Sequence, residues 1–307
     1  MKLASFRGQG AQPRTGAVVD GRVFDIGDFI ASLPIETECA EALARRGVAP
    51  PAGGMLRLLY AGAGAIAMVA GELESLARGG AASRPLGETV LLAPVPRPGK
   101  IVAVGRNYAD HAKETGVDPF EQPRIIAKLP SCVTGPGSVV VRPQAVTKLD
   151  FEVELAVIIG AFAANVPRAR ALDCVAGYSV LNDVSAREFQ FDVSPPQTTF
   201  AKSMDGFCPM GPWLVTRNEI PDPQALEVAC YVNGERMQHG HTHDMIFPVD
   251  RLIEYISGFM TLEPGDVIAT GTPAGVGAFR KPPVWLAPGD RVRLEISKIG
   301  TLEHSIG

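Results

Sequence analysis

Three carboxylates that alternate with apolar residues are the most constraining feature of this sequence. They are Asp150, Glu152 and Glu154 in the stretch 149–160, and the apolar run 156–159 follows them directly. Successive side chains of an extended strand point to opposite faces, so the three acids would share one face of a strand that enters the core. Like charges side by side are destabilising unless water or a cation compensates them. The stretch therefore predicts either a metal site or an edge strand with a solvated acidic face.

Composition places the chain among globular proteins and excludes some partners. Its 307 residues, 46% of them hydrophobic and 20% charged, suffice for a large core and a smaller domain. A net charge of −4 without a basic run argues against a nucleic-acid partner. The first residues lack the apolar stretch of a signal peptide, and the longest apolar run, 61–71, is too short to span a bilayer. We therefore expect a cytoplasmic protein without a membrane segment.

The cysteines and histidines give no strong zinc or disulfide signal. Five cysteines, an odd number, are scattered without a C-x-x-C spacing, which predicts free and mostly buried thiols. They are Cys39, Cys132, Cys174, Cys208 and Cys230. The alternating histidines His239, His241 and His243 could bind zinc on one strand face, but no fourth ligand is evident.

A proline-rich connector divides the chain near residue 95. Residues 81–100 contain four prolines, which are typical of a linking segment. Before it, a hairpin over 16–26 with an Asp-Gly turn precedes helices at 39–46 and 55–77. We predict a small α+β N-terminal domain over 1–95 and a β-rich catalytic domain over 96–307.

A histidine and a glutamate follow the first strand of the second domain. His111 and Glu114 lie three residues apart in the helical segment 109–114 and are therefore neighbours on its surface. The carboxylate can hold the tautomer of the imidazole and raise its basicity, as in a general-base pair. The alternative is a surface pair worth a few tenths of a kcal/mol.

A second polar cluster follows the strand 177–183. If residues 184–190 are helical, Asp183, Arg187 and Gln190 fall on one helix face. An ordinary helix salt bridge would produce the same spacing. Lys202, in the loop 199–207, could equally be a solvated surface lysine.

A glycine-rich loop lies in the C-terminal part, after the hairpin 226–238, the amphipathic helix 249–260 and the strand 262–270. The loop, 271–277, matches neither nucleotide-binding glycine motif. It can still present backbone N–H groups and a threonine hydroxyl to a carboxylate.

Taken together, these clusters resemble the fumarylacetoacetate hydrolase family over residues 100–300. The motifs are Asp150-Phe-Glu-Val-Glu-Leu, Asn182-Asp-Val-Ser-Ala-Arg-Glu-Phe-Gln, Gly234-Glu with Gln238, Met245-Ile-Phe, and Pro264-Gly-Asp-Val-Ile-Ala-Thr-Gly-Thr-Pro-Ala-Gly-Val-Gly. The resemblance implies an α+β, β-rich fold with a mixed β-sandwich or β-roll catalytic domain, and a homodimer.

The family motifs carry over to individual residues of this chain. They imply metal ligands at Glu152, Glu154 and Asp183, and catalytic residues at His111, Glu114 and Lys202. Substrate-binding residues are expected at Arg106, Tyr108, Arg187, Gln190, Gly271 and Thr272. Ala201 and Gly206 stand where many members have Gly and Thr, which predicts a pocket wall near Lys202 tuned to a particular substrate.

Three carboxylates suit Mg²⁺, with Mn²⁺ or Ca²⁺ as alternatives, and leave positions for a chelating 2-oxo acid. For a 2,4-dioxo acid, we hypothesise that His111 deprotonates a water that attacks C4 while Lys202 stabilises the oxyanion. The predicted activity is hydrolysis of a C–C bond that releases pyruvate from an acylpyruvate or a diketo-deoxy-sugar acid.

Other activities remain open. Oxaloacetate decarboxylation, isomerisation of unsaturated oxo acids and hydration need the same stabilised enolate but no nucleophilic water at C4. A Schiff base on Lys202 would instead make an aldolase, and a protein that only binds sugar acids is the non-enzymatic alternative.

Overall fold

Two strands that are buried along their whole length form the centre of the fold. They are β11 (Val153–Ile159) and β12 (Val175–Asn182), whose side chains are all buried. Continuous apolar runs of this kind need cover on both faces. The strands pair antiparallel, and Val153 at the start of β11 lies opposite Asn182 at the end of β12. The computed structural model describes residues 1–8, 13–78, 82–116 and 118–307.

These strands belong to a twelve-stranded sheet with the order β4-β3-β2-β1-β14-β12-β11-β17-β6-β7, with β5 beside β1 and β8 beside β14. Its other members are β1 (Lys2–Arg7), β2 (Pro13–Val19), β3 (Arg22–Asp25), β4 (Ser83–Pro85), β5 (Leu91–Leu92), β6 (Ile101–Gly105), β7 (Arg124–Lys128), β8 (Val133–Thr134), β14 (Cys208–Thr216) and β17 (Val267–Ala269). Strands β17 and β6 run parallel to each other and β17 runs antiparallel to β11. The start of β11 and the ends of β12, β17 and β6 therefore lie at the same edge of the sheet.

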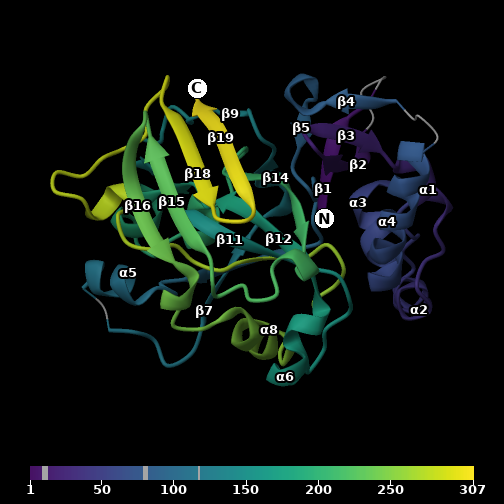
Figure 1. Ribbon diagram of the computed structural model, residues 1–307. Coiled ribbons are helices and arrows are strands. Elements are labelled where there is room, and N and C mark those ends of the chain that lie inside the picture. Colours follow the sequence, from purple (N-terminus) through teal and green to yellow (C-terminus); the bar gives the residue numbers. More distant parts are fainter. Residues whose placement is uncertain (9–12, 79–81, 117) are drawn as a thin grey trace.

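A five-stranded sheet covers β11, β12 and β14, as Figure 1 shows. Its order is β16-β15-β18-β19-β9, with bounds β9 (Val139–Val140), β15 (Glu227–Val232), β16 (Glu235–His241), β18 (Arg291–Ile296) and β19 (Gly300–Ile306). The short strands β10 (Leu149–Asp150) and β13 (Ser185–Ala186) pair with each other. The β-rich α+β class with a sandwich of sheets is confirmed.

The helices fall into two groups along the chain, before and after residue 100. The first group, beside strands β1–β3, contains α1 (Gly27–Ser32), α2 (Thr37–Arg45), α3 (Gly54–Tyr60) and α4 (Gly62–Arg78). The second contains α5 (Ala109–Glu114), α6 (Arg168–Ala171), α7 (Thr198–Ala201) and α8 (Val249–Ser257).

The predicted helix 55–77 is two helices, α3 and α4, with a bend of 118° between them. Gly62 adopts φ +85 there, a conformation that breaks helical geometry and that glycine adopts at little cost. In the part of the chain that the structure describes, no single helix has the length and apolar character to cross a membrane, although this bent pair meets both criteria when taken together.

Two of the predicted elements around the carboxylates are wrong. The stretch 149–160 is not one strand, because Phe151 and Glu152 lie between β10 and β11. Residues 184–190 are not a helix but β13 followed by a π-helical segment, Glu188–Asp192. The backbone pairing of Leu149 with Ala186 imposes this extended conformation. The argument from one shared helix face was therefore wrong.

The N-terminal strands continue the main sheet. Leu3 of β1 pairs with Leu214 of β14, and the N-terminal amine donates to Thr216. The boundary near residue 95 stays a prediction. All five cysteines are buried free thiols, as predicted.

Candidate active site

Three buried carboxylates meet at the edge of the main sheet. One oxygen from each of Glu152, Glu154 and Asp183 lies within 4.8 Å of the others. Their residues are 5%, 2% and 2% exposed, so the alternative of a solvated acidic face is wrong. Glu152 precedes β11, Glu154 is its second residue, and Asp183 follows β12. The antiparallel pairing of β11 with β12 brings these positions together.

Backbone hydrogen bonds fix the two strand ends. The Glu152 carbonyl accepts the N–H of Asp183 at 2.9 Å, and the Asn182 side-chain oxygen accepts the N–H of Glu152 at 2.9 Å. Gln238, from β16, accepts the N–H of Val153 through its side-chain oxygen at 3.0 Å. The position of Glu152 outside a regular strand is thus set by side chains from other elements.

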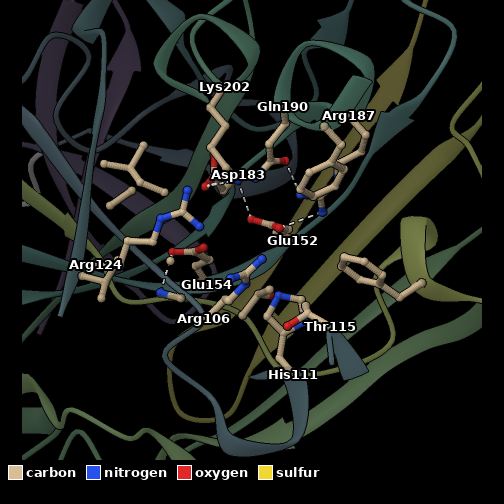
Figure 2. A pocket seen from close by; sticks show the side chains of 18 residues that line it. Arg106, His111, Thr115, Arg124, Glu152, Glu154, Asp183, Arg187, Gln190 and Lys202 are labelled. Atoms are coloured by element: carbon tan, nitrogen blue, oxygen red, sulfur yellow. Dashed lines mark hydrogen bonds and ion pairs between the residues drawn. The ribbon is translucent and has the colours of Figure 1, made fainter. Parts of the chain in front are cut away.

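Lys202 bridges two of the carboxylates. Its Nζ lies 2.7 Å from each of Glu152 Oε2, Asp183 Oδ2 and Ser185 Oγ. Since an ammonium has three N–H donors, all of them are occupied. Figure 2 shows Lys202 reaching down to the carboxylates.

Lys128, which the sequence analysis did not identify, holds Asp183 from the other side. Its Nζ donates to Asp183 Oδ1 at 2.7 Å, to the Phe207 carbonyl at 3.1 Å and to the Lys202 carbonyl. Burial alone would lower the pKa of Lys128, but Asp183 outweighs it and raises that pKa above its ordinary value. The side chain is therefore a buried ammonium. Alternation along β7 places Arg124, Ile126 and Lys128 on one face, and this was the available sequence signal.

Arg187 ties Glu152 to Asp150. Its guanidinium donates to Asp150 Oδ2 at 2.8 Å, Glu152 Oε1 at 2.7 Å and Gln190 Oε1 at 2.8 Å. Burial raises the pKa of Glu152, but Lys202 and Arg187 outweigh it, so this pKa lies below its ordinary value. Arg187 thus pairs with the protein's own acids.

Glu154 is the least compensated of the three carboxyls. In the described structure it accepts one hydrogen bond, from the N–H of Gly271 to Oε2 at 2.8 Å. Burial raises the pKa of Glu154 well above its ordinary value, and the neighbouring Asp183 and Glu152 raise it further. A divalent cation in the cluster would offset the repulsion among the three carboxylates and favour the ionised form of Glu154.

The donor set fits a hard divalent cation. It consists of carboxylate oxygens alone, and each such oxygen has two lone pairs, so an oxygen that accepts one hydrogen bond can still bind a metal. Glu152, Glu154 and Asp183 would hold this ion.

The glycine-rich loop donates backbone hydrogen bonds to carboxylates of the protein itself. Backbone N–H groups donate from Gly271 to Glu154, from Gly275 to Glu114 Oε1 at 3.0 Å and from Gly277 to Asp150 at 2.7 Å. A Cβ at position 277 would lie 1.9 Å from the Val284 carbonyl oxygen and 2.6 Å from Asp150. Glycine is therefore required there by close backbone approach.

His111 and Glu114 form the expected pair on α5. His111 Nδ1 lies 3.0 Å from Glu114 Oε2, and Glu114 is itself held by Gly275. With Nδ1 bonded to a carboxylate, Nε2 is the nitrogen that remains for a ligand. His111 is buried and lines the same cavity as the three carboxylates.

The cavity encloses about 480 Å³, including the part that opens to solvent. Of the predicted site residues it is lined by Arg106, His111, Glu152, Glu154, Asp183, Arg187, Gln190, Lys202, Gly271 and Thr272. Tyr108 and Glu114 do not line it. Tyr108 is fully buried, so its direct contact with substrate stays a prediction. Thr115, Arg124 and Phe279 line the cavity and were not predicted.

The three histidines form no metal group with acids or cysteines in the described part of the chain. His239 Nε2 instead lies 2.7 Å from Glu227 Oε1, and the rings of His241 and His243 stack.

Comparisons with known proteins find relatives over most of the chain. The family model for the C-terminal part of fumarylacetoacetate (FAA) hydrolase matches residues 100–307. The mitochondrial oxaloacetate tautomerase FAHD2A of Homo sapiens is 46% identical over 222 residues, which cover 72% of this chain and 71% of that protein. Its Bos taurus relative FAHD2B, also named an oxaloacetate tautomerase, is 45% identical over the same share.

A solved structure covers the whole chain. Maleylpyruvate hydrolase from Sphingobium sp. SYK-6, in complex with manganese(II) and pyruvate, has a TM-score of 0.77 and 33% identity over 100% of this chain and 98% of its own. The N-terminal segment that the family model leaves out is thus shared with this structure.

Proposed function

Because this chain belongs to the fumarylacetoacetate hydrolase family, whose members are enzymes, we propose that it is a divalent-metal-dependent enzyme that interconverts the enol and keto forms of a 2-oxo acid. Oxaloacetate is the proposed substrate, because relatives at 45% and 46% identity are named oxaloacetate tautomerases. The observation that carries the proposal is His111, oriented by Glu114, in one cavity with three carboxylates.

The protein itself supplies the base for the proton transfer. A bound divalent cation, proposed to be Mg²⁺, supplies Lewis-acid stabilisation of negative charge on the 2-oxo oxygen. His111 Nε2 takes a proton from C3 in the enol-forming direction, since Nδ1 is engaged by Glu114. In the opposite direction the imidazolium returns its proton to C3, and the enol hydroxyl loses its own to solvent. A positioned base of this kind contributes about 10²- to 10⁴-fold in rate.

The contacts of Lys202 favour proton transfer over hydrolysis. An oxyanion at C4 needs a free donor, but all three N–H groups of Lys202 point at Glu152, Asp183 and Ser185. The same ion pairs argue against an aldolase, because an ammonium held between two carboxylates has no lone pair for a carbonyl carbon. We therefore assign Lys202 to holding the carboxylates in place.

Hydrolysis of a C–C bond in a 2,4-dioxo acid is the second candidate. The likeness to maleylpyruvate hydrolase over the whole chain favours it, as does the His111–Glu114 pair, which could also activate water.

One pair of assays tests both candidates. Enol-oxaloacetate is mixed with the enzyme and Mg²⁺, and the keto form is followed with malate dehydrogenase. Release of pyruvate from an acylpyruvate is followed with lactate dehydrogenase, and both assays are repeated with excess EDTA. Chelator-sensitive acceleration of ketonisation without pyruvate release supports the tautomerase. Chelator-sensitive pyruvate release from the acylpyruvate that is faster than the accelerated ketonisation supports the hydrolase. No activity in either assay refutes both candidate functions.

The choice of Mg²⁺, a homodimer and a cytoplasmic location are further proposals. Manganese in the maleylpyruvate hydrolase structure supports a divalent metal of this type. The animal relatives are named as mitochondrial proteins, so the location is best tested in the source cell by fractionation.

A further inference from the structure

Two arginines on the cavity wall have no acidic partner. Arg106 follows β6, Arg124 begins β7, and both line the cavity that contains the three carboxylates. Neither side chain has an ion pair or a hydrogen bond to another residue in the described structure, although Arg106 lies over the Phe120 ring at 5.7 Å. Arg187, by contrast, forms ion pairs with both Asp150 and Glu152.

The pairing of β6 with β7 brings the two side chains together. Gly105 lies opposite Arg124 in the register of these strands, so Arg106 and Arg124 occupy the same edge of the sheet. Figure 2 shows both guanidinium groups pointing inward near Glu154. Burial and the charge of Arg124 lower the pKa of Arg106 from its ordinary value.

Arg106 is also held in a costly backbone conformation. Its φ is +57, which a residue with a side chain adopts at a cost of about 1–2 kcal/mol. Two like charges and a strained backbone at one wall are destabilising unless a counter-charge is present. An anionic ligand would relieve the repulsion between them.

From these observations we propose that Arg106 and Arg124 bind a second carboxylate of the substrate, with Arg124 as a residue that selects 2-oxo diacids over 2-oxo monoacids. The inference rests on the proposed function, since the 2-oxo carboxylate end is taken to lie at Glu152, Glu154 and Asp183. A guanidinium binds a carboxylate through two parallel hydrogen bonds, and such charge-assisted bonds are roughly twice as strong as neutral ones.

The charges around the cavity agree with a dianion. The buried cations Lys128, Arg187 and Lys202 are matched by Asp150, Glu152 and Asp183. A divalent cation at the cluster would more than neutralise Glu154. The two unpaired arginines then leave the wall positive, and a ligand with two negative charges offsets this better than one with a single charge.

The test compares two stable ligands of equal chain length by isothermal titration calorimetry with Mg²⁺ present. 2-Oxoglutarate carries the second carboxylate, and 2-oxopentanoate lacks it. We expect the wild-type protein to bind 2-oxoglutarate roughly 10- to 100-fold more tightly, as a charge-assisted pair provides. Arg124→Met should remove most of this preference, since only Arg106 then remains for the second carboxylate, and should leave 2-oxopentanoate binding unchanged. Arg124→Lys should restore part of the preference.

Arg142→Met is the matched control. Arg142 has a similar partial exposure but lies outside the cavity, so its loss should leave both affinities unchanged. Equal affinity of the wild-type protein for the two ligands, or an equal loss of both in Arg124→Met, would overturn the subsite alone. Absence of binding of either ligand by the Mg²⁺-loaded wild-type protein would overturn the proposed function together with the subsite.

Discussion

His304 should make the stability of this protein depend on pH. The residue lies on β19, is 4% exposed, and its Nε2 lies 2.8 Å from the Asn182 side-chain nitrogen. Asn182 uses its oxygen to accept the N–H of Glu152, so its NH₂ must face the imidazole. Nε2 is therefore an acceptor and His304 is neutral. A proton on Nε2 would set two donors against each other.

The size of the effect follows from the two pKa values. Burial lowers the pKa of His304 from the ordinary 6.5 to about 4. Between these values the unfolded chain binds more protons than the folded one, so stability is fully present above pH 6.5 and falls as the pH drops toward 4. Linkage gives a loss of about 2 kcal/mol between pH 7.5 and 5.

The test is urea unfolding of the wild-type protein and His304→Gln at pH 7.5, 6 and 5, with EDTA present. Glutamine keeps an oxygen acceptor for Asn182 but does not titrate in this range. We expect the wild-type protein to lose about 2 kcal/mol more than His304→Gln over this pH range, at similar m values. An equal loss in the two proteins would refute the reasoning, because the titration would then belong to other groups.

Three further changes test the site and its loop. His111→Ala should lower turnover by about 10²- to 10⁴-fold and leave Mn²⁺ affinity by calorimetry unchanged, and normal turnover would remove His111 from the mechanism. Glu154→Gln should weaken Mn²⁺ binding by more than about a hundredfold, since even changes outside the ligand shell cost about 10- to 100-fold, whereas unchanged affinity would place the metal elsewhere. Gly277→Ala should lower the free energy of unfolding by at least about 2 kcal/mol through its clash with Val284. The control is Gly71→Ala in α4, where an added Cβ has no atom within 4 Å. This change should raise the free energy of unfolding by up to about 1 kcal/mol. Equal effects of the two changes in chemical denaturation would contradict the packing argument.

Elements with local signals were predictable from the sequence. The Asp20-Gly21 and Asn233-Gly234 turns adopt positive φ at both central residues and close the expected hairpins. The helix that carries His111 and Glu114 has the predicted bounds. The contact between these two side chains was predictable because it depends only on their spacing of three residues within one helix.

Elements that depend on distant partners were not predictable. The extended backbone at Ser185 follows from pairing with Asp150, and Arg187 is turned toward acids that precede it by more than thirty residues. Lys128 shows the same limit most clearly. From the sequence, a lysine at the end of a short strand is expected to be exposed to solvent. Its burial in the charged form is explained only by the ion pair with Asp183.

The ion pairs of each cation separate its structural role from a role in binding. Lys128, Lys202 and Arg187 each contact at least one buried carboxylate, and removing one of them would leave an uncompensated buried charge, at a cost of about 3–5 kcal/mol. These cations hold the ligand set in shape, and the two lysines have no donors to spare for the substrate. Arg106 and Arg124 contact no acid in the described structure, and their charge is available to a ligand. A change at the first three should therefore affect folding and metal binding, whereas a change at Arg124 should affect only the choice of substrate.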